Sequence, residues 1–211
     1  MLRSVALLAT ILVTSQVATS DEPELVTIHL KQGCSFECPK SLTILDKSNV
    51  LKIETKVAET AASISPKLKE KVEKATLAFF AADGQKNPPC QMSLLILPAE
   101  ISQQQLKEFE ADQLLQLREI MHQQSADQFT KLRISVTKKL PPEVKAGASL
   151  SYFLWGYEFV DDDKIPKVSI RAYYYTEAAT FILGISCHKT YFDANSKTLY
   201  AALESFRTSD K

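Results

Sequence analysis

Glycine is scarce in this chain of 211 residues: five glycines stand singly at positions 33, 84, 147, 156 and 184. A phosphate-binding loop needs clustered glycines, because its backbone must approach the anion closely, so a dinucleotide fingerprint and a P-loop are excluded. Histidine is also scarce, and His29, His122 and His188 fit neither a His-Glu-x-x-His motif nor a nucleophile elbow. The sequence therefore predicts no enzyme, no catalytic residues and no cofactor.

The chain has no excess charge of either sign, with 25 basic and 25 acidic residues. Affinity for a phosphate backbone or an anionic membrane depends on clustered Lys and Arg. We therefore expect no binding to nucleic acid.

Long apolar runs are missing as well. The run from Val5 to Val13 is far shorter than the ~20 residues that cross a membrane. Arg3 precedes it, and the small residues Ala18 and Ser20 lie just before Asp21, which is typical of a secretory signal peptide over residues 1–20. We expect a secreted or periplasmic protein without an integral span, with an uncleaved anchor as the alternative. Residues 21–211 are then long enough for a single domain.

Four cysteines, Cys34, Cys38, Cys90 and Cys187, favour two disulfides in an exported chain. The first two lie in "GCSFECPK", where the phenylalanine and the proline favour an extended backbone. In a strand their Cα atoms would be about 13 Å apart at ~3.3 Å per residue, beyond the ~7 Å limit for a disulfide. Each is therefore predicted to pair with Cys90 or Cys187 rather than with the other.

Metal or thiol-redox chemistry is the alternative for these cysteines. Cys34, Cys38 and His188, which stands beside Cys187, could recruit copper or zinc, although the paired close-spaced ligands typical of zinc sites are missing. A thioredoxin-like centre needs Cys-x-x-Cys, and the spacing here is one residue too long. The leading prediction contains no metal.

Caps and apolar spacing predict three helices. They run from Pro66, behind the N-cap Ser65, to a stop at Gly84, with apolar residues at 68, 72, 75 and 79; from the capping box Ser102–Gln105 to about Gln124, with an apolar stripe at 106, 109, 114, 117 and 121; and from the N-cap Asp193, burying positions 199, 203 and 206.

Alternating and β-branched stretches predict the strands. These are "LVTIHL", "CSFEC", "VLKIETKV", "MSLLILP", "KLRISV", "SLSYFLWGYEFV", "KVSIRAYYYT" and "TFILGISC". The connections "DDDKIP" and "EAA" are so short that the last three strands must be antiparallel neighbours. The acidic run Asp161–Asp163 lacks the glycine and distal glutamate of a calcium loop, so it is predicted to form a polar hairpin turn.

Tyr173, Tyr174 and Tyr175 are consecutive in one predicted strand, so Tyr174 must face away from the other two. Either both faces of the sheet are covered, or Tyr173 and Tyr175 form a surface for a partner, since exposed tyrosine suits recognition.

Two stretches of the chain are similar to PsbP-like domains. "GCSFECP" resembles the family's opening strand, and "FILGISCHKTYFDANSKTLYAALESF" resembles its closing strand and helix. The resemblance implies an α+β fold in which an antiparallel sheet is packed between helices, shared with the Mog-type Ran-binding and DcrB-like proteins. It also implies a non-enzymatic binding or assembly module, without transferring any functional residue.

We therefore predict an exported, disulfide-bonded α+β domain that recognises another exported protein. Two alternatives stay open: the metal-binding or thiol-redox protein centred on Cys34, Cys38 and His188, and a carrier of a small apolar ligand bound between sheet and helix.

Overall fold

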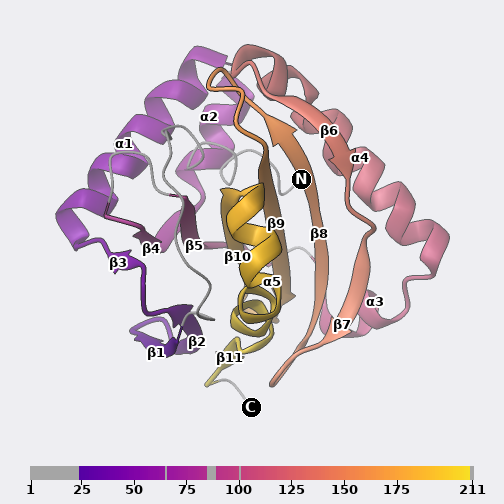
Figure 1. Ribbon diagram of the computed structural model, residues 1–211. Helices are drawn as coiled ribbons and strands as arrows, with labels where there is room; N and C mark the ends of the chain where they lie inside the picture. Colours follow the sequence, from indigo (N-terminus) through magenta and orange to yellow (C-terminus); the bar gives the residue numbers. More distant parts are fainter. Residues whose placement is uncertain (1–23, 65, 85–88, 100, 210–211) are drawn as a thin grey trace.

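The computed structural model describes residues 24–209 except 65, 85–88 and 100, and its elements form three layers. A large antiparallel sheet lies in the middle, with a small sheet and one helix on one face and four helices on the other (Figure 1). The signal peptide predicted over residues 1–20 and the N-cap predicted at Ser65 lie outside the described residues. Within the part that the structure describes, no helix is long and apolar enough to cross a membrane.

The large sheet has the strand order β3-β4-β5-β10-β9-β8-β6, with β7 also paired to β8. All its pairs are antiparallel, as the short connections between the last three strands predicted. The strands are β3 (Thr43–Ile44), β4 (Thr76–Ala82), β5 (Cys90–Pro98), β6 (Ser135–Lys139), β7 (Glu143–Ala146), β8 (Ser151–Val160), β9 (Lys167–Tyr175) and β10 (Ala179–His188).

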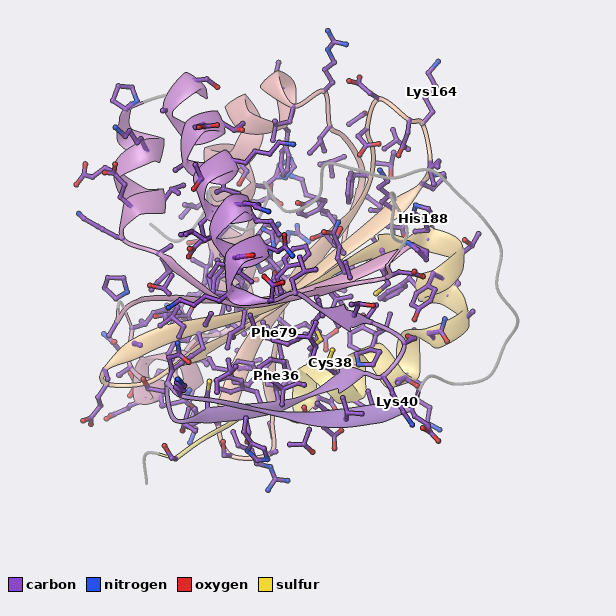
Figure 2. The ribbon with its side chains drawn as sticks, turned by 90° about the vertical axis from the view of Figure 1, so that its left-hand side faces the viewer. Phe36, Cys38, Lys40, Phe79, Lys164 and His188 are labelled. Carbon is purple, nitrogen blue, oxygen red and sulfur yellow. The ribbon has the colours of Figure 1, made fainter. Side chains whose placement is uncertain are left out.

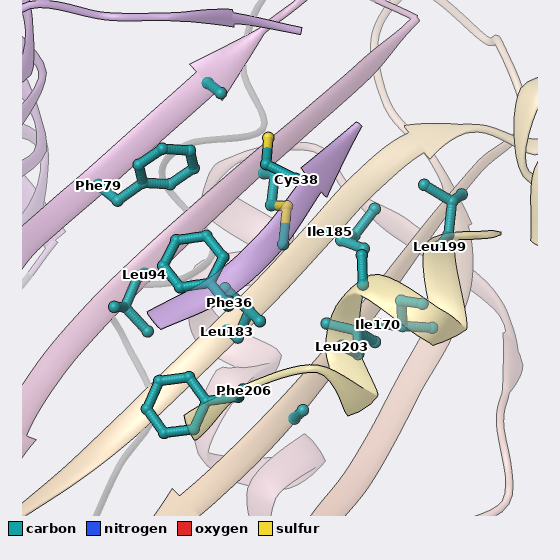
Figure 3. Close-up of a cluster of buried hydrophobic side chains, with 14 of the residues drawn as sticks. Phe36, Cys38, Phe79, Leu94, Ile170, Leu183, Ile185, Leu199, Leu203 and Phe206 are labelled. Carbon is teal, nitrogen blue, oxygen red and sulfur yellow. The ribbon is translucent and has the colours of Figure 1, made fainter. Parts of the chain in front are cut away.

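One face of this sheet is covered by α5 (Lys189–Glu204) and by a small sheet of β1 (Leu25–Leu30), β2 (Cys34–Pro39) and β11 (Arg207–Thr208). Figure 2 shows the β1–β2 hairpin lying against the sheet, with Phe36 and Cys38 pointing toward it. Phe36 packs edge-on against Phe79 of β4 at 5.0 Å between ring centroids, and Figure 3 shows this core continuing to Leu199 and Leu203 of α5. We call this the α5 face.

The other face, which we call the α1/α4 face, is covered at its two sides by separate groups of helices. On the β4 side lie α1 (Lys47–Ile64) and α2 (Pro66–Glu73), and on the β8 and β6 side lie α3 (Gln103–Lys107) and α4 (Ala111–Lys131) (Figure 1). The arrangement confirms the predicted α+β fold with a sheet packed between helices.

The strand predicted at "VLKIETKV" is wrong, because these residues lie within α1. Asp46 caps this helix: its Oδ1 accepts a hydrogen bond from Asn49 N at 2.9 Å. The apolar residues Val50, Ile53 and Val57 are three and four residues apart, which places them on one helical face against the sheet and α2. The same short stretch also contains a two-residue alternation, so the period alone did not decide between helix and strand.

The helix predicted over residues 66–84 is correct only for its first half. It begins at Pro66 as predicted but ends at Glu73, and Phe79 lies in β4. The sequence "TLAFFAA" buries its central residues between α1 and the α5-face core, and it pairs with β5 along its length. Pairing with a strand distant in sequence therefore overrides the apolar spacing that predicted a helix.

The other two helices begin or end elsewhere than predicted. The capping box of Ser102 and Gln105 is confirmed, but α3 is short, and the apolar stripe continues in α4, which extends to Lys131 rather than to Gln124. The last helix begins at Lys189, and the predicted N-cap Asp193 lies inside it, paired with Lys189 at 2.7 Å. The strand predicted at "KLRISV" begins only at Ser135, because the chain turns at Arg133 with φ of 51°.

Candidate functional site

A cavity of about 310 Å³ lies between the first two helices and the sheet on the α1/α4 face. Its lining is mostly apolar, and this volume is at the lower end of the ~300–1,000 Å³ of small-molecule sites. The apolar lining comes from α1, α2, β4 and β5, namely Ile53, Val57, Ala58, Val72, Leu77 and Leu95. The cavity is therefore able to enclose an apolar group.

Polar side chains follow two rows across the neighbouring strands of the same face. The strand registers align Trp155, Arg171, Gly184 and Ser93 in one row, and Tyr157, Ser169, Ser186 and Gln91 in the next. A second, small cavity of about 20 Å³ is lined by members of both rows, and it shares Ser93 and Leu95 with the apolar cavity. We call these two rows the polar rows; they adjoin the apolar cavity at Ser93.

Arg171 is the charged residue of the polar rows, and it is 3% exposed. Its Nη2 donates to the hydroxyl of Tyr157 at 3.2 Å, and its guanidinium lies 5.8 Å from the ring centre of Trp155. No carboxylate among the described residues forms an ion pair with it. Burial raises the pKa of Tyr157, so its hydroxyl stays neutral and does not balance the charge of Arg171.

Lys167 lies on the same strand and the same face, but its charge is balanced. Its Nζ donates to Oδ2 of Asp161 at 2.6 Å and to Oδ2 of Asp163 at 2.7 Å, and only 2% of its side chain is exposed. The acidic run therefore folds back over the end of β9, and the Asp163 Oδ1 accepts from Ile165 N at 2.9 Å, as expected for a polar turn. Burial raises the pKa of the Asp161 carboxyl.

His188 stands directly opposite Lys167 in the strand register and is also buried. Its Nε2 has no hydrogen-bond partner among the described residues. Burial and, secondarily, the charge of Lys167 lower the pKa of this imidazole. His188 is therefore neutral at pH 7.

All four cysteines are buried free thiols in the structure, which corrects the predicted disulfide-bonded framework. Cys90 and Cys187 are opposite each other on β5 and β10. The amide of His188 donates to the carbonyl of Pro89 in the next pair, so Cys90 and Cys187 form a non-hydrogen-bonded pair, whose Cα atoms are typically about 4.5 Å apart. The pairing that suits a disulfide thus joins the two distant cysteines to each other, an arrangement that was not predicted.

The two cysteines of β2 differ in their surroundings. Burial and the neighbouring Cys90 raise the pKa of Cys38 to about 12, whereas burial alone raises the pKa of Cys34 to about 11. Thiols with such pKa values stay protonated, and a protonated thiol is neither a good nucleophile nor a metal ligand. The structure therefore gives these cysteines a place in the core of the α5 face (Figure 3).

The residues of the alternative metal site are not brought together. Cys34 and Cys38 belong to the core of the α5 face, whereas His188 is paired with Lys167 on the opposite face of the sheet. Figure 2 shows Cys38 and His188 well apart. Among the described residues, no group of three or more His, Cys, Asp or Glu is placed to hold a metal ion.

Tyr173 and Tyr175 do not form an exposed surface, because each is only 1% exposed. They pack under the helices of the α1/α4 face, and Tyr174 points to the α5 face, where its hydroxyl donates to the carbonyl of Leu203. The prediction of a partner surface at these two rings is therefore wrong, and the alternative, a sheet covered on both faces, is correct.

Sequence reasoning missed Arg171 and the polar rows. The signal was the alternation of Lys167, Ser169 and Arg171 along a strand otherwise rich in apolar residues. Such alternation ordinarily marks a face in water. In a sheet covered on both faces, it marks instead a polar area inside the protein.

Neither models of protein families nor curated proteins match this sequence. Among solved structures, the chain is similar to the cyanobacterial PsbP (CyanoP) of Synechocystis sp. PCC 6803, with a TM-score of 0.55 and 11% identity over 92% of this chain and 98% of that one. It also matches LpqN, a protein involved in cell envelope biogenesis of Mycobacterium tuberculosis, with a TM-score of 0.43 and 8% identity over 88% and 91% of the two chains. The first likeness shows a PsbP-like fold. Kinship with the Mog-type and DcrB-like proteins stays a prediction.

Proposed function

We propose that this protein is a non-enzymatic binding module that holds a small ligand, at least partly apolar, between α1, α2 and the sheet. The observation that carries the proposal is the cavity of about 310 Å³ with its lining of Ile53, Val57, Leu77 and Leu95. Apolar groups gain about 25 cal/mol for each Å² removed from water, so such a lining favours an apolar guest. Of the three functions predicted from the sequence, the geometry supports the small apolar-ligand carrier best.

Recognition of another exported protein is the second part of the proposal. The PsbP-like fold is compatible with the binding or assembly role that the sequence resemblance implies. A signal peptide over residues 1–20 would bring residues 21–211, as one domain, to a secreted or periplasmic partner. The N-terminal residue of the protein isolated from its host tests the export step, and we expect Asp21 there.

A neutral fluorescent apolar dye tests the cavity directly. Ala58 lines it, and Ala58→Phe places a phenyl ring inside, whereas Ala62→Phe adds the same ring to an exposed position of the same helix. We expect the dye to bind the wild type and Ala62→Phe equally and Ala58→Phe at least tenfold more weakly. Equal binding to all three proteins, with circular dichroism showing that each is folded, would place the dye elsewhere and refute the proposed site.

Native mass spectrometry of the protein purified from its own host supplies a second test. A bound small molecule that is retained by the wild type and Ala62→Phe, and lost from Ala58→Phe, is the expected result. A protein that carries nothing from its host and does not bind the dye would refute the ligand-binding function.

A further inference from the structure

We propose that the ligand is an amphipathic monocarboxylic acid, whose carboxylate is bound by Arg171 and whose apolar chain lies in the cavity between α1, α2 and the sheet. The inference rests on the proposed function and adds the chemical class of the ligand. Its basis is a buried cation without an ion-pair partner among the described residues, lining a small cavity that shares Ser93 and Leu95 with the apolar cavity.

The charge of Arg171 needs a counter-charge that the described residues do not supply. Charged side chains are almost never fully buried without a partner, and a guanidinium stays protonated inside a protein. Lys167, four residues earlier on the same face, shows how this fold balances a buried cation, with two carboxylates within 2.7 Å of its Nζ. Arg171 has instead the neutral side chains of Tyr157 and Tyr173 as hydrogen-bond partners, and the rings of Trp155 and Tyr157 beside its guanidinium. A bound anion would complete its surroundings.

The space beside Arg171 suits a small head group. The small cavity has a volume of about 20 Å³, which is close to the space that one water molecule needs. A guanidinium binds a planar carboxylate through two parallel hydrogen bonds. Ser93 and Ser186 line the same cavity, and their hydroxyls are able to donate further hydrogen bonds. The buried indole N–H of Trp155, in the same row as Arg171, has no acceptor among the described residues.

Gly184 leaves the space between Arg171 and Ser93 free of a side chain. It separates Arg171 from Ser93 in the strand register, and a Cβ there would lie 3.7 Å from Cγ of Arg171 and 3.6 Å from Oγ of Ser93. Arg171 and Ser93 are two strand spacings apart, about 9.6 Å. A ligand that spans both sites is therefore an extended molecule with one anionic end.

Two acidic residues on the helices that cover the apolar cavity bear on the orientation of this ligand. Glu54 and Glu73 both line it, and Glu54 accepts a hydrogen bond from Leu77 N at 2.9 Å. Glu73 is exposed and pairs with Lys69 at 3.6 Å, so its charge is balanced. Like charges repel, so a carboxylate is disfavoured beside Glu54 and favoured at Arg171. The chain of the ligand therefore points from Arg171 toward α1 and α2.

Dodecanoate and dodecanol, which share a chain and differ in charge, test the inference by displacing the neutral dye from the cavity. We expect the wild type to bind dodecanoate about ten- to a hundredfold more tightly than dodecanol, as expected for hydrogen bonds to a charged group. Arg171→Met should lose this preference and still bind dodecanol. Arg118→Met, which removes a half-buried arginine paired with Glu119 on α4, is the matched control and should keep the preference.

The outcomes separate this inference from the proposed function. If the wild type binds both compounds equally, or Arg171→Met keeps the preference, the carboxylate assignment is wrong while the apolar site stands. If neither compound displaces the dye from the wild type, the proposed function fails as well. Should Arg171→Met not fold, Gly184→Val fills the space between Arg171 and Ser93 and keeps the arginine; it must then lose dodecanoate binding, and retention would refute the inference.

Discussion

Replacing Lys167 tests how this fold stabilises a buried charge. Its Nζ lies 2.6 Å and 2.7 Å from carboxylate oxygens of Asp161 and Asp163, whose side chains are 17% and 15% exposed. Lys167→Met keeps the length of the side chain and removes its charge, so two neighbouring carboxylates lose their counter-charge. Breaking a buried ion pair by removing one partner typically costs about 3–5 kcal/mol, and we expect Lys167→Met to lower the free energy of unfolding by that amount at pH 7.

The loss of stability in Lys167→Met should depend on pH, and the pKa values of the two aspartates determine the direction. Without the lysine, the folded-state pKa values of Asp161 and Asp163 should rise above their unfolded values, because each carboxylate is left beside the other in a poorly solvated place. Stability linked to a raised carboxyl pKa is fully present below the unfolded pKa and is lost as the pH rises through the folded one. The deficit of Lys167→Met should therefore shrink from pH 7 to pH 4. The triple variant with Asp161→Asn and Asp163→Asn should recover most of it at pH 7.

Urea-induced unfolding, followed by circular dichroism at pH 7 and pH 4, measures these free energies. A loss below ~1 kcal/mol, as expected for an exposed ion pair, would refute the assignment of Lys167 as a buried, carboxylate-dependent cation. So would a deficit that does not change with pH.

Three further outcomes follow from other contacts. Gly156→Ala should destabilise the fold by about 1–3 kcal/mol in urea unfolding, because the added Cβ would lie 2.3 Å from the carbonyl oxygen of Ser169, and unchanged stability would show that β8 and β9 are able to move apart. The lowered pKa of His188 should make stability fall as the pH drops below about 6.5, its unfolded value, and His188→Gln should reduce this fall. Oxidation of the native protein by oxidised glutathione should join Cys90 to Cys187 in peptide maps, and a bridge from either of them to a β2 cysteine would instead support the pairing predicted from the sequence.

The C-terminal half of the fold could be predicted because its signals are local. Three long stretches with strand character are joined by "DDDKIP" and "EAA", and connections that short allow only antiparallel neighbours, so β8, β9 and β10 follow from the sequence in order and direction. The capping box at Ser102 is likewise a contact between residues three apart.

The N-terminal half could not be predicted as well because distant pairings decide it. Residues 76–82 form a strand rather than a helix because they pair with β5. Residues 50–57 form a helix rather than a strand because of the cap at Asp46 and the packing against α2 and β4. The insertion of β5 beside β10, some ninety positions later in the chain, leaves no local trace. It is this pairing that brings Cys90 opposite Cys187 and Ser93 into line with Arg171.

The candidate site could not be predicted for the same reason, and also because the pattern of a single strand does not show whether its polar face is covered by other elements. A lysine, a serine and an arginine alternating along β9 fit a water-exposed face equally well. Once helices cover both faces, the same residues indicate buried polar groups that need partners. A buried polar group without a partner is costly and persists only where something offsets that cost. For Lys167 the hairpin aspartates do so within the chain. For Arg171 no described residue does, and the small cavity beside it, which shares Ser93 and Leu95 with the apolar cavity, offers space for a counter-charge. If Arg171 binds a ligand carboxylate, Arg171→Met should keep or increase the free energy of unfolding of the ligand-free protein, since an unpaired buried charge is removed. If the arginine is purely structural, Arg171→Met should lower this free energy.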